Sequence, residues 1–219
     1  MKNNMKKLLG VMAVIFLFLF LFRPFLATAQ QTAEDYIKQG GIHIKAGQYD
    51  QAIAALTKAI EIDSRGALAY SLRGLAYFQK KQYDQAIADL TKTIKLNPTS
   101  AATYFIRGKA YFYNDQYNQA MADFTKAIEL DSTSVHAYYF RGMIYIDAGQ
   151  YDQAITDANK AIEINPKYAY AYYLKARTYE EMKRNKEAIE AYRAVIICAS
   201  LQEASIVEKA KKRIAELEK

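Results

Sequence analysis

The chain has 219 residues, of which 24% are charged and one is a cysteine. It is long enough for one domain with a real hydrophobic core, and its composition excludes an extensively disordered chain and an internal disulfide. The formal net charge of +7 arises at the two ends, because residues 30–174 hold equal numbers of basic and acidic residues; we therefore expect no nucleic-acid partner, which would need clustered Lys and Arg.

Residues 1–29 have the three parts of a secretory signal peptide. Three lysines precede fifteen uncharged residues, LLGVMAVIFLFLFLF, and a small-x-small site ends at Ala29. Cleavage there would leave residues 30–219 periplasmic or secreted. The alternative is an uncleaved inner-membrane anchor with the rest of the chain outside the cytoplasm, although fifteen residues are fewer than the roughly 20 that span a bilayer.

Residues 33–202 consist of five blocks of 34 residues without an insertion. The twentieth position is always Ala, and YDQAI occurs at residues 49–53, 83–87 and 151–155, with YNQAM at 117–121. Each half-block has apolar or small residues at helical spacing, and neither half can bury its apolar face alone, so the blocks must stack. The blocks are residues 33–66, 67–100, 101–134, 135–168 and 169–202.

These repeats resemble the tetratricopeptide repeat (TPR) family. The resemblance implies an all-α, right-handed α-solenoid of five helix-turn-helix units, occupying residues 30–202. The fifth block is atypical, with Ala176 in place of Gly and Asn185 in place of the Tyr that opens YDQAI. Residues 203–219 place Ile206, Ala210 and Ile214 on one helical stripe, which predicts the capping helix that such arrays need.

Arg occurs at position 7 only in those blocks that have Asp at position 23. This coincidence predicts ion pairs between the two helices of a repeat. The alternative is a set of unrelated surface charges. The predicted pairs are Arg73–Asp89, Arg107–Asp123 and Arg141–Asp157.

The sequence offers little for catalysis. Neither His43 nor His136 has Cys, Asp or Glu at metal-ligand spacing on its own helix, and no phosphate loop or hydrolase motif occurs. We expect no enzyme activity, no cofactor and no metal. Cys198 lies in the apolar run AVIICA and is expected to be a buried small hydrophobe, with an inter-chain disulfide as the alternative.

The TPR resemblance also implies a binding face, because in that family the first helix of each repeat lines the concave side and positions 2, 5, 9, 12 and 13 face the ligand. Many of these positions are aromatic here, and exposed aromatic surface is typical of an interaction site. Some of it could instead be covered by the neighbouring first helix. The candidate groove residues are Leu75, Phe78, Phe105, Lys109, Phe112, Tyr113, His136, Tyr139, Met143, Tyr173 and Arg177.

Some TPR proteins bind the C-terminal carboxylate of a chaperone with a Lys at position 5, and no block of this chain has Lys at that position. We therefore expect a protein or peptide partner with an amphipathic or aromatic segment, bound by a non-catalytic scaffold of the cell envelope. Two alternatives are a self-assembling structural element and a binder of a small amphipathic or lipid-like ligand. A membrane is expected as a partner only if the N-terminal segment is uncleaved, and oligomerisation is left open.

Overall fold

The computed structural model describes residues 31–200 and 203–219, so the predicted signal peptide lies outside the described residues. The described part contains eleven α-helices and no strand. None of these helices has both the length and the apolarity needed to cross a bilayer. The helices are α2 (Ala33–Lys45), α3 (Tyr49–Ile62), α4 (Ala67–Gln79), α5 (Tyr83–Leu96), α6 (Ala101–Tyr113), α7 (Tyr117–Leu130), α8 (Val135–Asp147), α9 (Tyr151–Ile164), α10 (Ala169–Glu181), α11 (Asn185–Cys198) and α12 (Ala204–Leu217).

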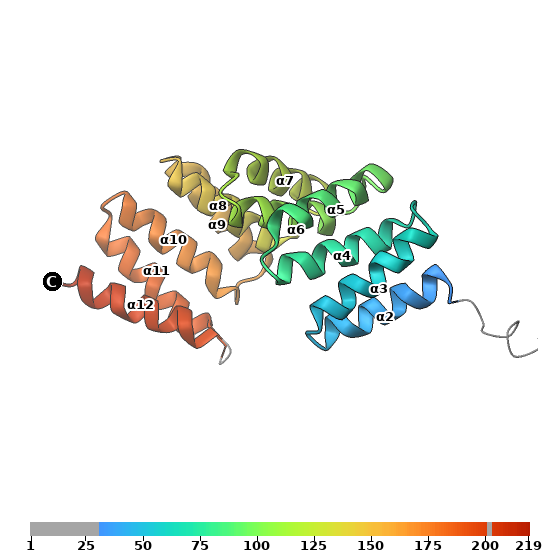
Figure 1. The fold of residues 1–219 in the computed structure, drawn as a ribbon. Coiled ribbons are helices and arrows are strands. Elements are labelled where there is room, and N and C mark those ends of the chain that lie inside the picture. Colours follow the sequence, from blue (N-terminus) through green and yellow to red (C-terminus); the bar gives the residue numbers. More distant parts are fainter. Residues whose placement is uncertain (1–30, 201–202) are drawn as a thin grey trace, which may run out of the picture.

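The helices form five hairpins that stack into a curved array, with α12 packed on α11 at the C-terminal end (Figure 1). Each hairpin pairs a first helix of 13 residues with a second helix of 14 residues. Successive first helices also touch, α2 with α4, α4 with α6 and α8 with α10, so the first helices share one face of the array. The chain is therefore the expected all-α solenoid.

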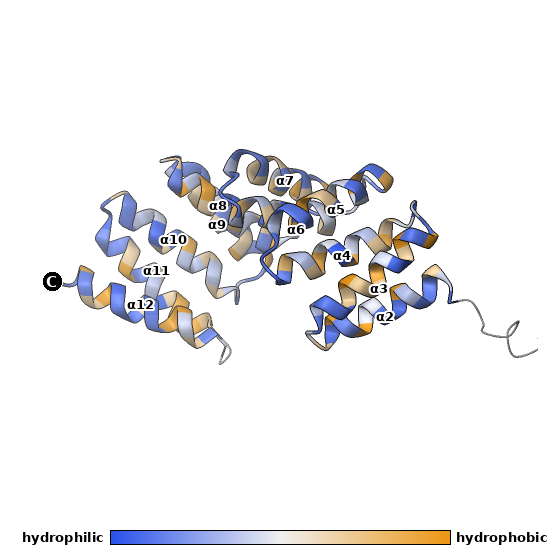
Figure 2. Ribbon diagram, in the orientation of Figure 1, coloured by the Kyte–Doolittle hydropathy of each residue, from blue (hydrophilic) through white to orange (hydrophobic). Residues whose placement is uncertain are grey.

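Small residues allow the two helices of a hairpin to approach closely. A Cβ atom added at Gly108 would lie 2.8 Å from Phe124 of the paired helix, and one at Gly74 would lie 2.9 Å from Leu90. Ala86 and Ala120, at the start of the second helices, are fully buried in the same interfaces. Both hydrophobic and hydrophilic residues occur on every helix, as expected when one face packs and the other meets water (Figure 2).

The loops have a repeated chemistry of their own. Within a hairpin, the turn contains one residue in the left-handed region, which is Gly47 or Gly149 in two repeats and Lys81, Asp115 or Lys183 in the others. Between hairpins, an Asp or Asn accepts a hydrogen bond at its Oδ1 from the backbone N–H two residues later, forming an Asx turn. These residues are Asp63, Asn97, Asp131 and Asn165.

Cys198 differs from its expected environment. It is the last residue of α11 and is half-buried rather than fully buried, and it packs against the apolar cluster formed by α10, α11 and α12. Its thiol donates a long hydrogen bond of 3.6 Å to the carbonyl of Pro166.

Candidate binding groove

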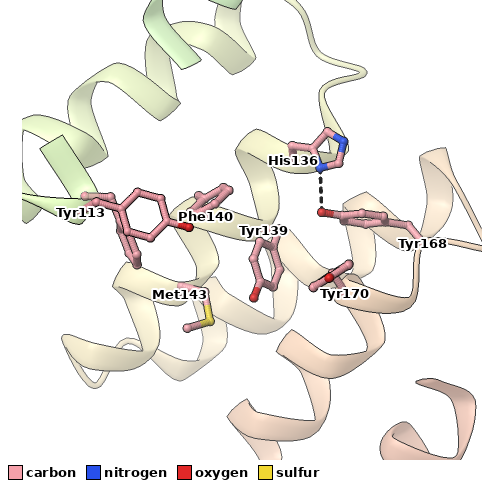
Figure 3. Close-up of a pocket in the computed structure, with 8 residues that line it drawn as sticks. Tyr113, His136, Tyr139, Phe140, Met143, Tyr168 and Tyr170 are labelled. Carbon is pink, nitrogen blue, oxygen red and sulfur yellow. Dashed lines mark hydrogen bonds between the residues drawn. The ribbon is translucent and has the colours of Figure 1, made fainter. Parts of the chain in front are cut away.

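An aromatic hollow of about 410 Å³ opens between α6, α8 and the beginning of α10. Its lining consists entirely of aromatic, His and Met side chains, and Figure 3 shows them gathered around one space. The lining residues are Phe112, Tyr113, His136, Tyr139, Phe140, Met143, Tyr168 and Tyr170.

The helical repeat places these side chains together. Four of them share one face of α8, because they follow one another at intervals of three, one and three residues. These are His136, Tyr139, Phe140 and Met143. Phe112 and Tyr113 end α6, whereas Tyr168 is the N-cap residue of α10 and Tyr170 lies in its first turn. Three consecutive first helices therefore contribute to the hollow.

Contacts between rings hold the walls of the hollow in place. Phe140 stacks on the buried Phe124 at 5.5 Å between ring centroids and meets the edges of Phe112 and Tyr139 at 5.4 Å each. Tyr139 also meets Tyr170 at 5.5 Å. Aromatic pairs of this geometry add about 0.5–1.5 kcal/mol each beyond simple burial. The hollow is therefore preformed.

Burial shifts the pKa values of four side chains in the hollow toward their neutral forms. Burial raises the pKa of Tyr139 to about 12 and also raises the pKa values of Tyr113 and Tyr168, so all three phenols keep their protons. Burial, together with the nearby charge of Lys109, lowers the pKa of His136. A hydrogen bond of 2.8 Å joins Nδ1 of this imidazole to the Tyr168 hydroxyl (Figure 3).

Two cations border the hollow. The ammonium of Lys109 on α6 lies 4.8 Å from the ring centroid of Phe78 and 5.6 Å from those of Phe105 and Phe140. Burial lowers its pKa. On α10, a guanidinium nitrogen of Arg177 lies 3.9 Å from the sulfur of Met143.

Five of the eleven candidate groove residues line the hollow, namely Phe112, Tyr113, His136, Tyr139 and Met143. Lys109 and Arg177 border it, and Phe78 contacts both Lys109 and Tyr113. Leu75 lies on α4, the preceding first helix, and is half-buried outside the hollow.

Phe105 and Tyr173 are half-buried and are not among the residues that line the hollow. Phe105 packs against Phe124 and Phe140, with centroids 6.0 Å away in each case, and Tyr173 packs against Tyr192 at 5.8 Å. Phe105 therefore contacts the wall of the hollow through Phe140 without lining its space.

Sequence reasoning missed three lining residues. Tyr170 occupies position 2, one of the groove positions, and could have been included among the candidates. Phe140 occupies position 6 and Tyr168 occupies position 34, outside the positions that face the ligand in the family. The one feature of the sequence that could have indicated Tyr168 as a lining residue is that it is aromatic and directly precedes a first helix.

All three predicted ion pairs are present, each between the two helices of one repeat. Arg107 Nε and Nη2 donate to the two carboxylate oxygens of Asp123 at 2.7 Å each. Its Nη1 donates to Thr91 of the preceding repeat at 3.0 Å. Arg73 and Arg141 repeat this geometry with Asp89 and Thr57, and with Asp157 and Thr125. Each arginine therefore also links two repeats, which the sequence pattern did not predict.

Within residues 31–200 and 203–219, no group of His, Cys, Asp and Glu side chains could hold a metal ion. The described residues form an α-solenoid with an aromatic hollow on its first helices, and repeat arrays of this kind typically use such extended surfaces for binding.

Comparisons with known proteins agree with this class. Tetratricopeptide repeat models match residues 67–100, 101–134, 135–168 and 158–190, and a TPR repeat model matches residues 40–81. A crystal structure of MamA is 30% identical, with a TM-score of 0.69, and the match covers 73% of this chain and 93% of that one. The chain belongs to the tetratricopeptide repeat family.

Two further solved structures share the fold. YrrB, described as a TPR protein with an unusual peptide-binding site, is 24% identical over 87% of this chain and 97% of its own, with a TM-score of 0.70. MamA from Desulfovibrio magneticus RS-1 is 18% identical over 77% of this chain and 96% of its own, with a TM-score of 0.72. No curated protein matches the chain by sequence.

Proposed function

We propose that this chain is a non-catalytic scaffold of the cell envelope that binds a peptide segment of a partner protein in the groove formed by α6, α8 and α10. The observation that carries the proposal is the preformed aromatic hollow of about 410 Å³. Tyr, Phe and Met are the side chains that anchor partners at protein interfaces. YrrB, which has the same fold, is described as having a peptide-binding site, and this supports a peptide as the ligand of the present chain.

The chemistry of the hollow supports binding rather than catalysis. General acid–base catalysis needs a group whose pKa lies near the working pH and that can exchange a proton with a substrate. The raised pKa values keep the phenols of Tyr113, Tyr139 and Tyr168 protonated, and none of the eight lining residues is a carboxylate or a cysteine. His136 is neutral and is engaged with Tyr168.

The N-terminal sequence supports placing the array outside the cytoplasm. Mass spectrometry of the chain recovered from the native cell tests this part of the proposal. An exported protein that begins at Gln30 is the expected result for a cleaved signal peptide, and an intact chain in the membrane fraction is the result for an anchor. Recovery of the intact chain from the cytoplasm would contradict export.

Peptide selection followed by measured binding tests the groove. Random peptides displayed on phage are selected on the full chain, and the affinity of an enriched peptide is then measured by fluorescence anisotropy. Because truncation of a central aromatic anchor costs about 2 kcal/mol, Tyr139→Ala and Tyr170→Ala should each weaken binding about 30-fold. The control Leu130→Ala changes an exposed residue at the end of α7 and should leave affinity unchanged. Equal affinities in all the variants would place the binding site elsewhere.

A further inference from the structure

The first helices that form the groove carry almost no negative charge. Helices α4 and α6 contain no acidic residue, and the acids of α8 and α10 lie only at their C-terminal ends. Those terminal acids are Asp147, Glu180 and Glu181, and Glu180 is already paired with Arg213 of α12. The carboxylates that pair with the position-7 arginines come from the second helices.

Lys109 and Arg177 differ from the position-7 arginines of these helices. Arg73, Arg107 and Arg141 each have a carboxylate partner. In the part of the chain that the structure describes, neither forms an ion pair: Lys109 lies against aromatic rings, and the one hydrogen-bond contact of Arg177 is with the Met143 sulfur. A half-buried cation without an anion has lost part of its hydration, so an incoming carboxylate would recover electrostatic energy there.

The two cations come from different first helices, and each contacts a residue of α8 that lines the hollow. Lys109 projects from α6 against Phe140 of α8, and Arg177 projects from α10 against Met143 of α8. The space between them is lined by the rings of Tyr113, Tyr139 and Tyr170. Within the described residues the hydroxyls of these three tyrosines make no hydrogen bond, whereas that of Tyr168 is bonded to His136. The groove therefore offers an apolar centre flanked by positive charge and by free hydroxyl donors.

We propose that the occupant is an acidic segment of a partner protein, in which an aromatic side chain enters the hollow and flanking Asp or Glu residues pair with Lys109 and Arg177. This inference rests on the proposed function and adds the chemical class of the ligand. The aromatic ring finds edge-to-face partners in Tyr139 and Phe140, and the carboxylates meet cations and phenol donors. A basic segment would instead place its cations against Lys109 and Arg177 and be repelled.

Synthetic peptides of matched length test the charge requirement on the full chain. One peptide has a central Phe flanked by Asp and Glu, a second has Asn and Gln in their place, and a third keeps the acids but replaces Phe with Ala. The acidic Phe peptide should bind about tenfold more tightly than each of the other two. Added NaCl should remove most of the difference between the first two, because partly exposed charges are screened.

A charge-matched pair of variants locates the effect. The double variant Lys109→Met, Arg177→Met should bind the acidic peptide about tenfold more weakly and the neutral peptide unchanged. The control Lys126→Met, Lys175→Met removes the same net charge from residues that contact Glu129 and Asn159 away from the hollow, and should bind both peptides as the parent does.

The outcomes separate this inference from the proposed function. Equal binding of the acidic and neutral peptides, with loss of both in Tyr139→Ala, would overturn the acidic ligand while leaving a peptide-binding groove. An acidic peptide that loses affinity equally in the two double variants would show a response to net charge alone and would also overturn it. If none of the three peptides binds, the inference fails, and the phage-selected peptide decides the proposed function independently.

Discussion

Removal of one partner from the Arg107–Asp123 pair should destabilise the array far more than removal of both. The Asp123 side chain is 6% exposed and that of Arg107 is 16% exposed, so the substitution Asp123→Ala leaves a nearly buried guanidinium without its anion. Breaking a buried pair in this way costs about 3–5 kcal/mol. Ala already stands at the equivalent position of the first and fifth blocks, as Ala55 and Ala191, so the helix itself accepts the change.

The double variant Arg107→Leu, Asp123→Ala removes both charges and fills the position-7 site with an apolar side chain. It should recover most of the loss and lie within about 1 kcal/mol of the parent, since the desolvation cost of a buried pair offsets much of its attraction. A remaining deficit of about 1 kcal/mol is expected from the hydrogen bond to Thr91 in the preceding repeat.

Urea unfolding followed by far-ultraviolet circular dichroism measures the free energies of the parent, the two single variants and the double variant. The four values form a double-mutant cycle, whose coupling energy should be at least about 2 kcal/mol. A single variant that costs less than about 1 kcal/mol would refute the reasoning. So would a double variant whose loss equals the sum of the two single losses.

Three further predictions concern packing, turn geometry and pH. Gly108→Ala would place its Cβ 2.8 Å from Phe124 and should lower the free energy of urea unfolding by about 1–3 kcal/mol. Gly41→Ala on helix α2, whose Cβ would meet no atom within 4 Å, should raise that free energy by about 0.5–1 kcal/mol. The opposite order would contradict the helix-packing account. Lys81 has φ of +60°, so Lys81→Gly should raise the unfolding free energy by about 1 kcal/mol in the same assay, and a loss of stability would be evidence against strain in this turn. The pKa of Tyr139 is raised from 10.0 to about 12, so its contribution to stability is fully present below pH 10 and is lost as the pH rises toward 12. Tyr139→Phe should therefore show a smaller decline of stability between pH 10 and pH 12 than the parent. An identical decline in the two proteins would refute the shift.

The period of 34 residues was sufficient to predict the fold. The same pattern of small and apolar residues occurs in every block, so a local irregularity in one block does not obscure where the helices lie. The first helices accordingly begin at the residue that opens each block, as at Ala67, Ala101 and Val135. The Arg–Asp pairs could also be inferred, since the two residue types appear together in three blocks and are absent together from two. Comparison among repeats within one chain thus carried information about contacts between helices.

The shape of the groove required the three-dimensional structure. Periodicity identifies the face on which a residue lies, but the sizes of the side chains around it determine whether its ring is open or covered. Phe105 lies on the expected face but packs against Phe140 and Phe124 instead of lining the hollow. Tyr168 lies in a loop position and reaches the hollow because its hydroxyl bonds to His136 in the preceding helix hairpin. Contacts between side chains 32 residues apart depend on the angle between neighbouring repeats, and that angle results from the packing of all their side chains together.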